Sequence, residues 1–161
     1  MTQKKTVLIT GAGSGIGRAL TMEAARLGHV PLITGRNRHK LEDTATLAGL
    51  PESAILPADV TLAEDRARLV VQVGGRLDIL INNAGCLTVG RLTDLGDAQL
   101  QAMTDTNLMA PIALTRDLLP ALRAGQGRVA NIGSVFGDIA YPYFAAYSAT
   151  KFGLRGFSDA L

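Results

Sequence analysis

The 161-residue chain is poor in cysteine, in net charge and in long apolar runs, and each shortage removes a class of protein. Its single cysteine, Cys86, permits no internal disulfide, which fits a reducing compartment. A formal charge of +2 is too small to indicate a nucleic acid or an anionic membrane as a partner. One cysteine and two histidines at unrelated positions, His29 and His39, offer no metal cluster.

No segment approaches the length of a membrane span. The apolar run after Lys4 and Lys5 covers only Val7–Ile9, which is too short for the core of a signal peptide, so we expect a cytoplasmic location. The hydrophobic share of 47% and the charged share of 19% are typical of a globular protein. The length predicts one domain, residues 1–161.

Short apolar runs alternate with helical patterns along the whole chain. Strands are predicted at Thr6–Thr10, Val30–Thr34, Ala54–Pro57, Leu77–Ile81 and Arg128–Ile132. Helices are predicted at Gly15–Leu27, Lys40–Ala48, Leu62–Val73 and Ala98–Arg123, and from Ala145 onward. This alternation predicts an α/β fold of Rossmann type, a doubly wound parallel sheet with strand order 3-2-1-4-5.

A glycine-rich loop, TGAGSGIG at Thr10–Gly17, follows the first predicted strand and opens a helix. Glycines here allow a tight turn and let backbone N–H groups approach a pyrophosphate. The spacing of Gly11, Gly15 and Gly17 is T-G-x-x-x-G-x-G, and no Gly-Lys-Ser/Thr follows, which excludes a P-loop. Two alternative interpretations of the loop are left. It could be a turn needed only for packing of the strand against the helix. It could also be a methyltransferase site, since Gly13, Gly15 and Gly17 satisfy a looser G-x-G-x-G.

The second predicted strand ends in Gly35 and Arg36, where an NAD site or a methyltransferase site has a carboxylate for the ribose hydroxyls. A missing acid and a planar cation suit a ribose 2′-phosphate, so Arg36 favours NADP(H) over NAD(H). Arg38 and Lys40 follow closely. The alternative for all three cations is the solvated start of a helix.

The third and fourth strands are also followed by polar residues. Asp59, beside Val60, is expected to accept the adenine amino group, or merely to cap the helix that begins near Leu62, and the two roles are compatible. The small, amide-rich run Asn82–Gly85 can stitch neighbouring strand ends together and let a cofactor pass closely.

Tyr147 and Lys151 are four residues apart and therefore share one face of a helix. A phenol titrates near pH 10 and is a poor base at neutral pH. A fixed ammonium beside it favours the phenolate and makes proton exchange feasible, while Ser134 can hold a substrate oxygen. Ser134 is not a hydrolase nucleophile of the G-x-S-x-G type, because Ile132 replaces the first glycine.

In this order, the motifs resemble those of the short-chain dehydrogenase/reductase family over essentially the whole chain. They are TGAGSGIG, Asp59, NNAG at Asn82–Gly85, Asn107 in DTNLMAP, Ser134 in NIGSVFG and YSATK at Tyr147–Lys151. The resemblance implies an oxidoreductase with Tyr147 as acid/base. It implies that Lys151 holds the nicotinamide ribose, that Ser134 orients the substrate oxygen and that Asn107 binds a water linking Lys151 to solvent.

The same resemblance implies a cofactor site and two kinds of partner. Cofactor contacts are expected from Thr10, Gly11, Ser14, Gly15, Ile16, Gly17, Arg36, Asp59, Val60, Asn83, Ala84, Gly85, Tyr147 and Lys151. The substrate is expected to be a small carbonyl or alcohol, with an apolar wall indicated by Tyr141, Tyr143 and Phe144. The long helix from Ala98 would be the surface of a homo-oligomer in a full-length form.

Members of this family typically continue for roughly ninety residues more, so we expect the C-terminal side to be incomplete. The strand Arg128–Ile132 would then be an exposed edge. Two hypotheses follow: an NADP-dependent oxidoreductase, or a truncated, catalytically silent nucleotide-binding module with a binding role. We expect the isolated chain to bind NADPH weakly and to turn over slowly or not at all.

Overall fold

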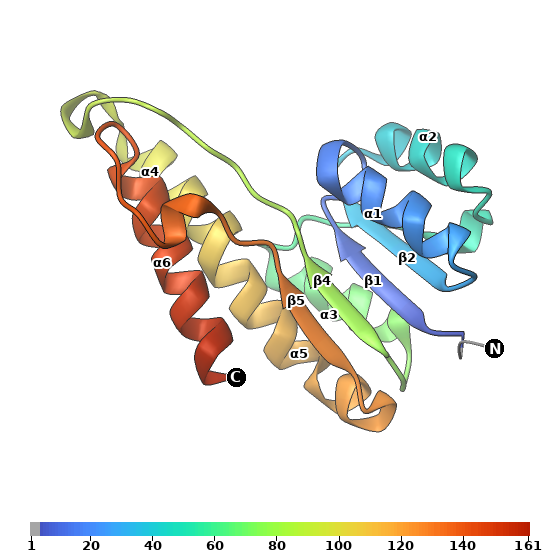
Figure 1. Ribbon diagram of the computed structural model, residues 1–161. Coiled ribbons are helices and arrows are strands. Elements are labelled where there is room, and N and C mark those ends of the chain that lie inside the picture. Colours follow the sequence, from blue (N-terminus) through green and yellow to red (C-terminus); the bar gives the residue numbers. More distant parts are fainter. Residues whose placement is uncertain (1–3) are drawn as a thin grey trace.

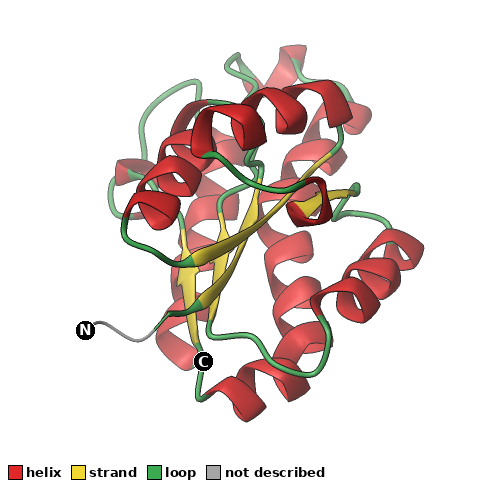
Figure 2. Cartoon of the chain, turned by 90° about the vertical axis from the view of Figure 1, so that its right-hand side faces the viewer, coloured by secondary structure: helices red, strands yellow, loops and turns green. Residues whose placement is uncertain are grey.

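A computed structural model describes residues 4–161 and consists of a parallel sheet between layers of helices (Figures 1 and 2). The strands are β1 (Thr6–Thr10), β2 (Val30–Gly35), β3 (Ile55–Pro57), β4 (Ile79–Asn82) and β5 (Arg128–Asn131). They pair in the order β3-β2-β1-β4-β5, which confirms the predicted order. The structure also confirms the predicted fold class.

The helices are α1 (Gly15–Arg26), α2 (Arg38–Ala48), α3 (Ala63–Val73), α4 (Asp97–Thr104), α5 (Ala110–Gly125) and α6 (Ala145–Ala160). Helix α2 begins two residues before the predicted start because the Asn37 side chain accepts a hydrogen bond from the Lys40 N–H and caps the helix. The predicted single helix Ala98–Arg123 is divided, since Asp105–Met109 forms a π turn between α4 and α5.

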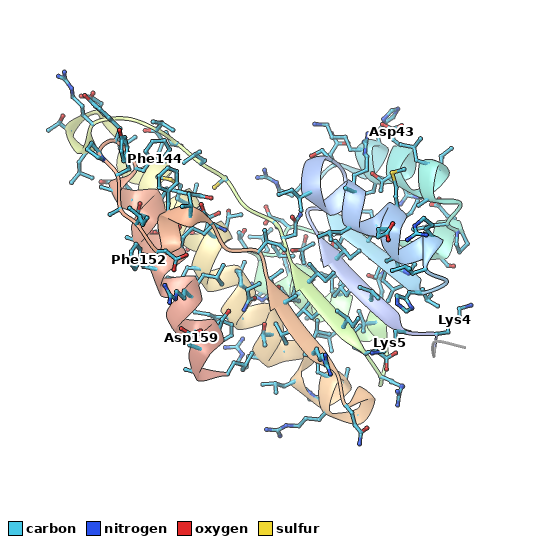
Figure 3. The ribbon with its side chains drawn as sticks, in the orientation of Figure 1. Lys4, Lys5, Asp43, Phe144, Phe152 and Asp159 are labelled. Carbon is cyan, nitrogen blue, oxygen red and sulfur yellow. The ribbon has the colours of Figure 1, made fainter. Side chains whose placement is uncertain are left out.

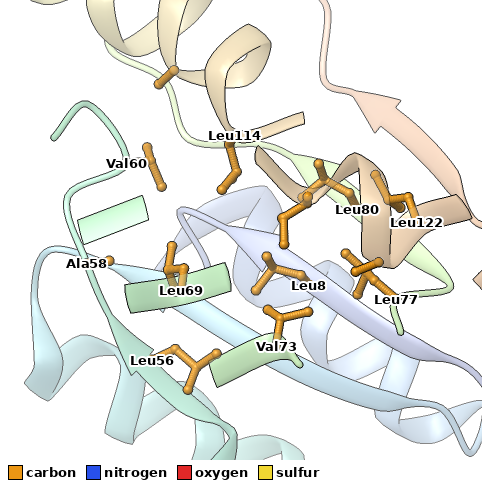
Figure 4. Close-up of a cluster of buried hydrophobic side chains, with 13 residues drawn as sticks. Leu8, Leu56, Ala58, Val60, Leu69, Val73, Leu77, Leu80, Leu114 and Leu122 are labelled. Carbon is orange, nitrogen blue, oxygen red and sulfur yellow. The ribbon is translucent and has the colours of Figure 1, made fainter. Parts of the chain in front are cut away.

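Alternation along the strands separates two apolar cores. Leu8 and Leu80 face α3 and α5, while Val7, Ile9 and Ile33 face α1 and α2. The first core, shown in Figure 4, contains residues from β1, β3, β4, α3 and α5 and from the segments beside them. Its buried members are Leu8, Leu56, Ala58, Val60, Leu69, Val73, Leu77, Leu80, Ala110, Leu114, Leu118, Ala121 and Leu122.

Five strand boundaries differ from the prediction: β2 and β4 each end one residue later, β5 ends one residue earlier, and β3 and β4 begin later. Ala54 belongs to a 3₁₀ turn, so β3 begins at Ile55. Leu77 is buried but precedes β4, because its N–H donates to the carbonyl of Ala121 at 3.0 Å instead of to a neighbouring strand. In the sequence alone, an apolar residue that is buried against a helix cannot be distinguished from a buried strand residue.

Because all strand pairs are parallel, the carboxyl ends of the strands lie at one edge of the sheet. The loops that leave this edge carry the glycine run, Arg36, Asp59, the NNAG run and Ser134. The segments after β4 and β5 extend together toward α4 and α6 in Figure 1, and α6 packs against α4 and the π turn. The fold thus places the predicted site residues at one end of the molecule.

Candidate active site

The glycine loop leaves β1 at Thr10 and enters α1 at Gly15. Gly11 has φ +65°, and a Cβ there would lie 2.9 Å from the Cα of Ala84. A Cβ on Gly17 would lie 2.4 Å from the carbonyl oxygen of Gly11. Gly15 also has a positive φ, +51°, but faces open space. Packing therefore explains Gly11 and Gly17, whereas the space at Gly15 is available to a ligand.

A cleft of about 430 Å³ opens in front of this loop. The segments that line it come from four strand ends, as Rossmann-type ligand sites do. Among the predicted cofactor residues, its lining includes Gly11, Ser14, Gly15, Ile16, Arg36, Asp59, Val60, Asn83, Ala84 and Gly85. The other predicted cofactor residues are not part of the lining; they are Thr10, Gly17, Tyr147 and Lys151.

Thr10 and Asn83 join β1 to the segment after β4. The Thr10 hydroxyl accepts from the N–H groups of Asn83 and Ala84, each at 2.9 Å. The Asn83 amide donates to the carbonyls of Thr10 at 2.9 Å and Gly11 at 3.3 Å. The expected stitching of strand ends is present, and it fixes the floor of the cleft.

The three cations after β2 have different surroundings. Arg36 and Lys40 line the cleft, whereas Arg38 pairs with Glu42 and Glu52. Arg38 therefore matches the alternative of a solvated helix start. Arg36 and Lys40 are therefore the two of these cations that line the cleft.

Asp59 does not cap α3, so that alternative is wrong. Its Oδ1 accepts from the N–H of Thr61 at 3.0 Å and from the Thr61 hydroxyl at 2.7 Å, which closes a local turn. The N-terminal residue beside α3 is Leu62, which has no capping side chain. Asp59 and Val60 both line the cleft. Their position agrees with a contact to adenine, and this role stays a prediction.

Residues in the first turn of α3 hold this Asp59–Thr61 turn in place. The N–H of Asp59 donates to Asp65 Oδ2 at 2.7 Å, and this bond is the main cause of the lowered pKa of the Asp65 carboxyl. Arg66 donates to the carbonyls of Val60 and Thr61, each at 3.0 Å, and pairs with Asp117 on α5 at 3.1 Å. The turn is thereby anchored to two helices.

Ser134 follows β5 and caps a 3₁₀ turn, where its Oγ accepts from the Phe136 N–H at 3.2 Å. Ser134 and Lys151 line a second hollow of about 550 Å³, which adjoins α6. The Lys151 Nζ donates to the Ile132 carbonyl at 2.8 Å and lies 5.7 Å from the centroid of the Tyr147 ring. Tyr147 and Lys151 do share one side of α6, as their spacing predicts.

Lys151 is 7% exposed, and its burial lowers the pKa of its ammonium below the ordinary value, an effect that the nearby Cys86 opposes. An ammonium has three donors, and one is used by Ile132. Two donors therefore remain for groups that enter the site.

Asn107 lies in the π turn and is 1% exposed. Its amide accepts from the Cys86 N–H and donates to the Cys86 carbonyl, both at 2.8 Å, and it also donates to Thr150 at 3.3 Å. Both amide hydrogens are thus used within the protein. A water at Asn107 would therefore have to donate to the side-chain oxygen, which has one acceptor site left, or bond to the Asn107 backbone.

Several residues around the site were not expected from the sequence. Cys86, for which the sequence indicated only that no internal disulfide can form, lines the main cleft, and its N–H donates to the Asn107 amide oxygen. Thr150, Asp65 and Arg66 support site residues through the contacts above. The only signal for them was their closeness in sequence to Lys151 and Asp59.

Two kinds of feature are missing from residues 4–161. No group of three metal-ligating side chains comes together there. None of the described helices combines the length and the apolar character that crossing a membrane requires.

Comparison with known proteins gives consistent matches. A family model described as short chain dehydrogenase matches residues 5–161. The 11-beta-hydroxysteroid dehydrogenase 1A of Arabidopsis thaliana is 35% identical over 164 residues, covering 98% of this chain and 47% of that protein. The chain spans about half the length of the curated relatives it matches.

Solved structures superpose closely on the fold. A short-chain dehydrogenase from Streptomyces avermitilis has a TM-score of 0.89 at 35% identity, over 99% of this chain and 60% of that one. A metagenomic short-chain oxidoreductase in complex with NADP has a TM-score of 0.90 at 31% identity, over 97% of this chain and 74% of that one.

Proposed function

The chain belongs to the short-chain dehydrogenase/reductase family, whose members are oxidoreductases that bind a nicotinamide cofactor, and we propose that it transfers a hydride between NADP(H) and a carbonyl or alcohol substrate. The observation that carries this proposal is the joint placement of the glycine-loop cleft and the pair Tyr147–Lys151 at one end of the molecule. A dinucleotide site and a proton donor are the two parts that such a reaction needs.

The cleft fits a nicotinamide dinucleotide phosphate. Gly11 and Gly17 let the backbone turn close to the floor, and open space at Gly15 leaves room for a pyrophosphate at the N-terminus of α1. Arg36 lines the cleft directly after β2, where the chain has no carboxylate. The NADP complex of a structural neighbour supports the choice of NADP(H). When bound, the nicotinamide supplies or accepts the hydride.

Tyr147 acts as the acid/base in this proposal. Its phenol gives a proton to the carbonyl oxygen during reduction and removes one from the alcohol during oxidation. Lys151 stabilises negative charge on the phenol and directs its free donors to the ribose hydroxyls. Ser134 donates a hydrogen bond to the substrate oxygen and so keeps it near Tyr147.

The test is the substitution Tyr147→Phe, which removes one hydroxyl and keeps the ring. The centroid of this ring lies 6.2 Å from that of Phe136, in a T-shaped arrangement. In the full-length form, we expect NADPH oxidation with a test ketone to fall at least about 100-fold, the usual size of a general acid's contribution. NADPH binding, measured by fluorescence titration, should stay within about twofold. Ser53→Ala, which removes an exposed hydroxyl far from these residues in sequence, is the control and should leave both values unchanged.

Activity retained by Tyr147→Phe would refute the assignment of the acid/base. If the wild-type full-length form binds NADPH but reduces no carbonyl, the alternative of a catalytically silent binding module is favoured.

A further inference from the structure

We propose that Arg66 is a positioning residue for the adenosine half of the cofactor. It holds the Asp59–Thr61 turn, which forms one wall of the cleft, and Asp117 on α5 holds Arg66. This inference rests on the proposed function for the identity of the ligand. Arg66 is not part of the lining of the cleft and therefore acts through the turn.

The first observation is the place of the turn in the cleft. Strand β3, which precedes the turn, is at the opposite edge of the sheet from β5, which precedes Ser134. The N–H of Ala58 donates to the carbonyl of Gly35 at 3.1 Å and so brings the turn next to Arg36. In NADP(H), the 2′-phosphate and the adenine belong to the same nucleoside. If Arg36 meets that phosphate, the turn meets the adenosine half.

The second observation is the way in which Arg66 uses its donors. Its Nη1 donates to the carbonyls of Val60 and Thr61, each at 3.0 Å, and its Nε donates to Asp117 Oδ2 at 3.1 Å. A guanidinium fixes these donors in one plane, so both carbonyls take a defined position relative to Asp117. Arg66 is 8% exposed, and a buried carbonyl that loses its donor stays unpaired at a cost in free energy. The turn is therefore held in one conformation.

The third observation is the partner that keeps Arg66 in place. The Asp117 carboxylate accepts from Arg66 and also from Arg116 at 2.8 Å. Burial works to raise the pKa of Asp117, but the hydrogen bonds from Arg116 and Arg66 outweigh it and lower the pKa below its ordinary value. The carboxylate is therefore ionised at neutral pH, as a largely buried guanidinium requires of its partner. Helix α5 thereby sets the position of Arg66.

The fourth observation separates Arg66 from the cations of the cleft. Val60, from the turn, is buried with Leu114 of α5 in the core of Figure 4, on the face of the sheet that α3 and α5 cover. Lys40 lines the cleft from α2, whose Asp43 is labelled in Figure 3, and α2 covers the opposite face. Arg66 therefore supports the wall from behind, whereas the cations of the cleft face the ligand.

The experiment uses 2′,5′-ADP, which is the adenosine half of NADP(H) with its 2′-phosphate. The variant Arg66→Met removes the guanidinium donors and keeps the apolar stem. In calorimetric titrations we expect it to bind 2′,5′-ADP at least about tenfold more weakly than wild type. NADPH should lose affinity by the same factor, because the two ligands share only the adenosine half. In the full-length form, the KM for NADPH should rise while kcat stays within about twofold.

The matched control is Arg116→Met, which removes the other arginine bonded to the same carboxylate. Arg116 has a side chain that is 69% exposed, and both affinities should stay within about twofold of wild type. Circular dichroism and the melting temperature show whether each variant folds. If Arg66→Met does not fold, Asp117→Asn decides the question. It keeps an oxygen acceptor but removes the charge, and we expect about threefold weaker binding of 2′,5′-ADP.

Unchanged binding of 2′,5′-ADP by folded Arg66→Met, or by Asp117→Asn in its place, would overturn the inference and leave the proposed function intact. A larger loss for NADPH than for 2′,5′-ADP would mean that the variant disturbs the whole cleft, and the positioning role is then wrong. The same holds if wild type binds NADPH but not 2′,5′-ADP. If wild type binds neither ligand, the proposed function itself fails.

Discussion

Gly17 is the glycine of the glycine loop with the least space for a side chain. Its Cα faces the carbonyl oxygen of Gly11 and the amide of Asn83, and a Cβ would lie 2.4 Å from the first and 2.6 Å from the second. The same Asn83 amide bonds to the carbonyl of Thr10. A side chain at Gly17 would therefore push apart the contacts that join β1 to the segment after β4.

We expect Gly17→Ala to destabilise the protein by about 1–3 kcal/mol, the usual range for overpacking, and to weaken NADPH binding. Gly156→Ala is the matched control, since it is also a helical glycine but has nothing within 4 Å of the added Cβ. That control should stabilise the fold by about 0.5–1 kcal/mol through backbone entropy. Urea unfolding measures both, and equal stability of the two variants would contradict the packing account.

Residues with a local motif could be placed from the sequence, whereas residues that act across the fold could not. The sequence predicted that the NNAG run joins strand ends, and Asn83 does so. It gave no reason to pair Cys86 with Asn107, because the two are 21 positions apart and meet only after the chain has crossed between β4 and β5. Local spacing carries no information on such a contact.

At the scale of elements, helices were found from periodicity, but their interruptions were not. The apolar period runs through Asp105–Met109 with little change, so a π turn there reads as α-helix. The turn places Asn107 against Cys86 and Thr150. Its position beside the candidate site agrees with the frequent occurrence of such turns at functional sites.

The capping of α3 was one of two roles that the sequence left open for Asp59. A carboxylate a few residues before a helix commonly caps it, and Asp59 precedes α3 by four residues. In the structure the carboxylate that bonds to the loop is Asp65, from inside the helix, and it accepts the N–H of Asp59. This bond joins a carboxylate inside the helix to an N–H before it, whereas capping would join a side chain before the helix to an N–H inside it.

This bond predicts a pH dependence of stability. The folded state lowers the pKa of Asp65 from its ordinary value of 3.8, chiefly through the Asp59 N–H. A lowered folded pKa means that the ionised carboxylate stabilises the fold above the unfolded pKa and that this stability is lost as pH falls through the folded one. We therefore expect Asp65→Asn to be less stable than wild type at pH 7, with the gap closing below about pH 4.

Urea midpoints across this pH range would measure the gap. Glu64→Gln is the control, because the neighbouring carboxylate makes no hydrogen bond to any described residue. Asp65→Asn should also weaken NADPH binding, since the Asp59–Thr61 turn lines the cleft. A gap that is constant from pH 7 to pH 3 would contradict the role of the ionised carboxylate.

At the scale of the whole molecule, the order of the strands was the part most securely predicted. Apolar strands that alternate with helices must cross over in one hand, which leaves few arrangements of the sheet. The shape of the cleft was not predictable in the same way, because its walls come from four loops whose conformations depend on one another. Arg36 and Arg38 illustrate this: they are two residues apart, yet only Arg36 lines the cleft.

Ligand binding to the folded state raises the stability of the whole molecule, by about 2.7 kcal/mol when the ligand is at 100 times its Kd. If Arg36 meets a 2′-phosphate, NADPH must raise the melting temperature more than the same concentration of NADH. We expect Arg36→Ala to remove this difference and to keep the effect of NADH. Arg38→Ala, whose arginine is paired with Glu42 and Glu52, should preserve the difference. Thermal unfolding with either nucleotide measures this without any turnover, and an equal or larger shift with NADH in the wild-type chain would refute the preference for NADP(H).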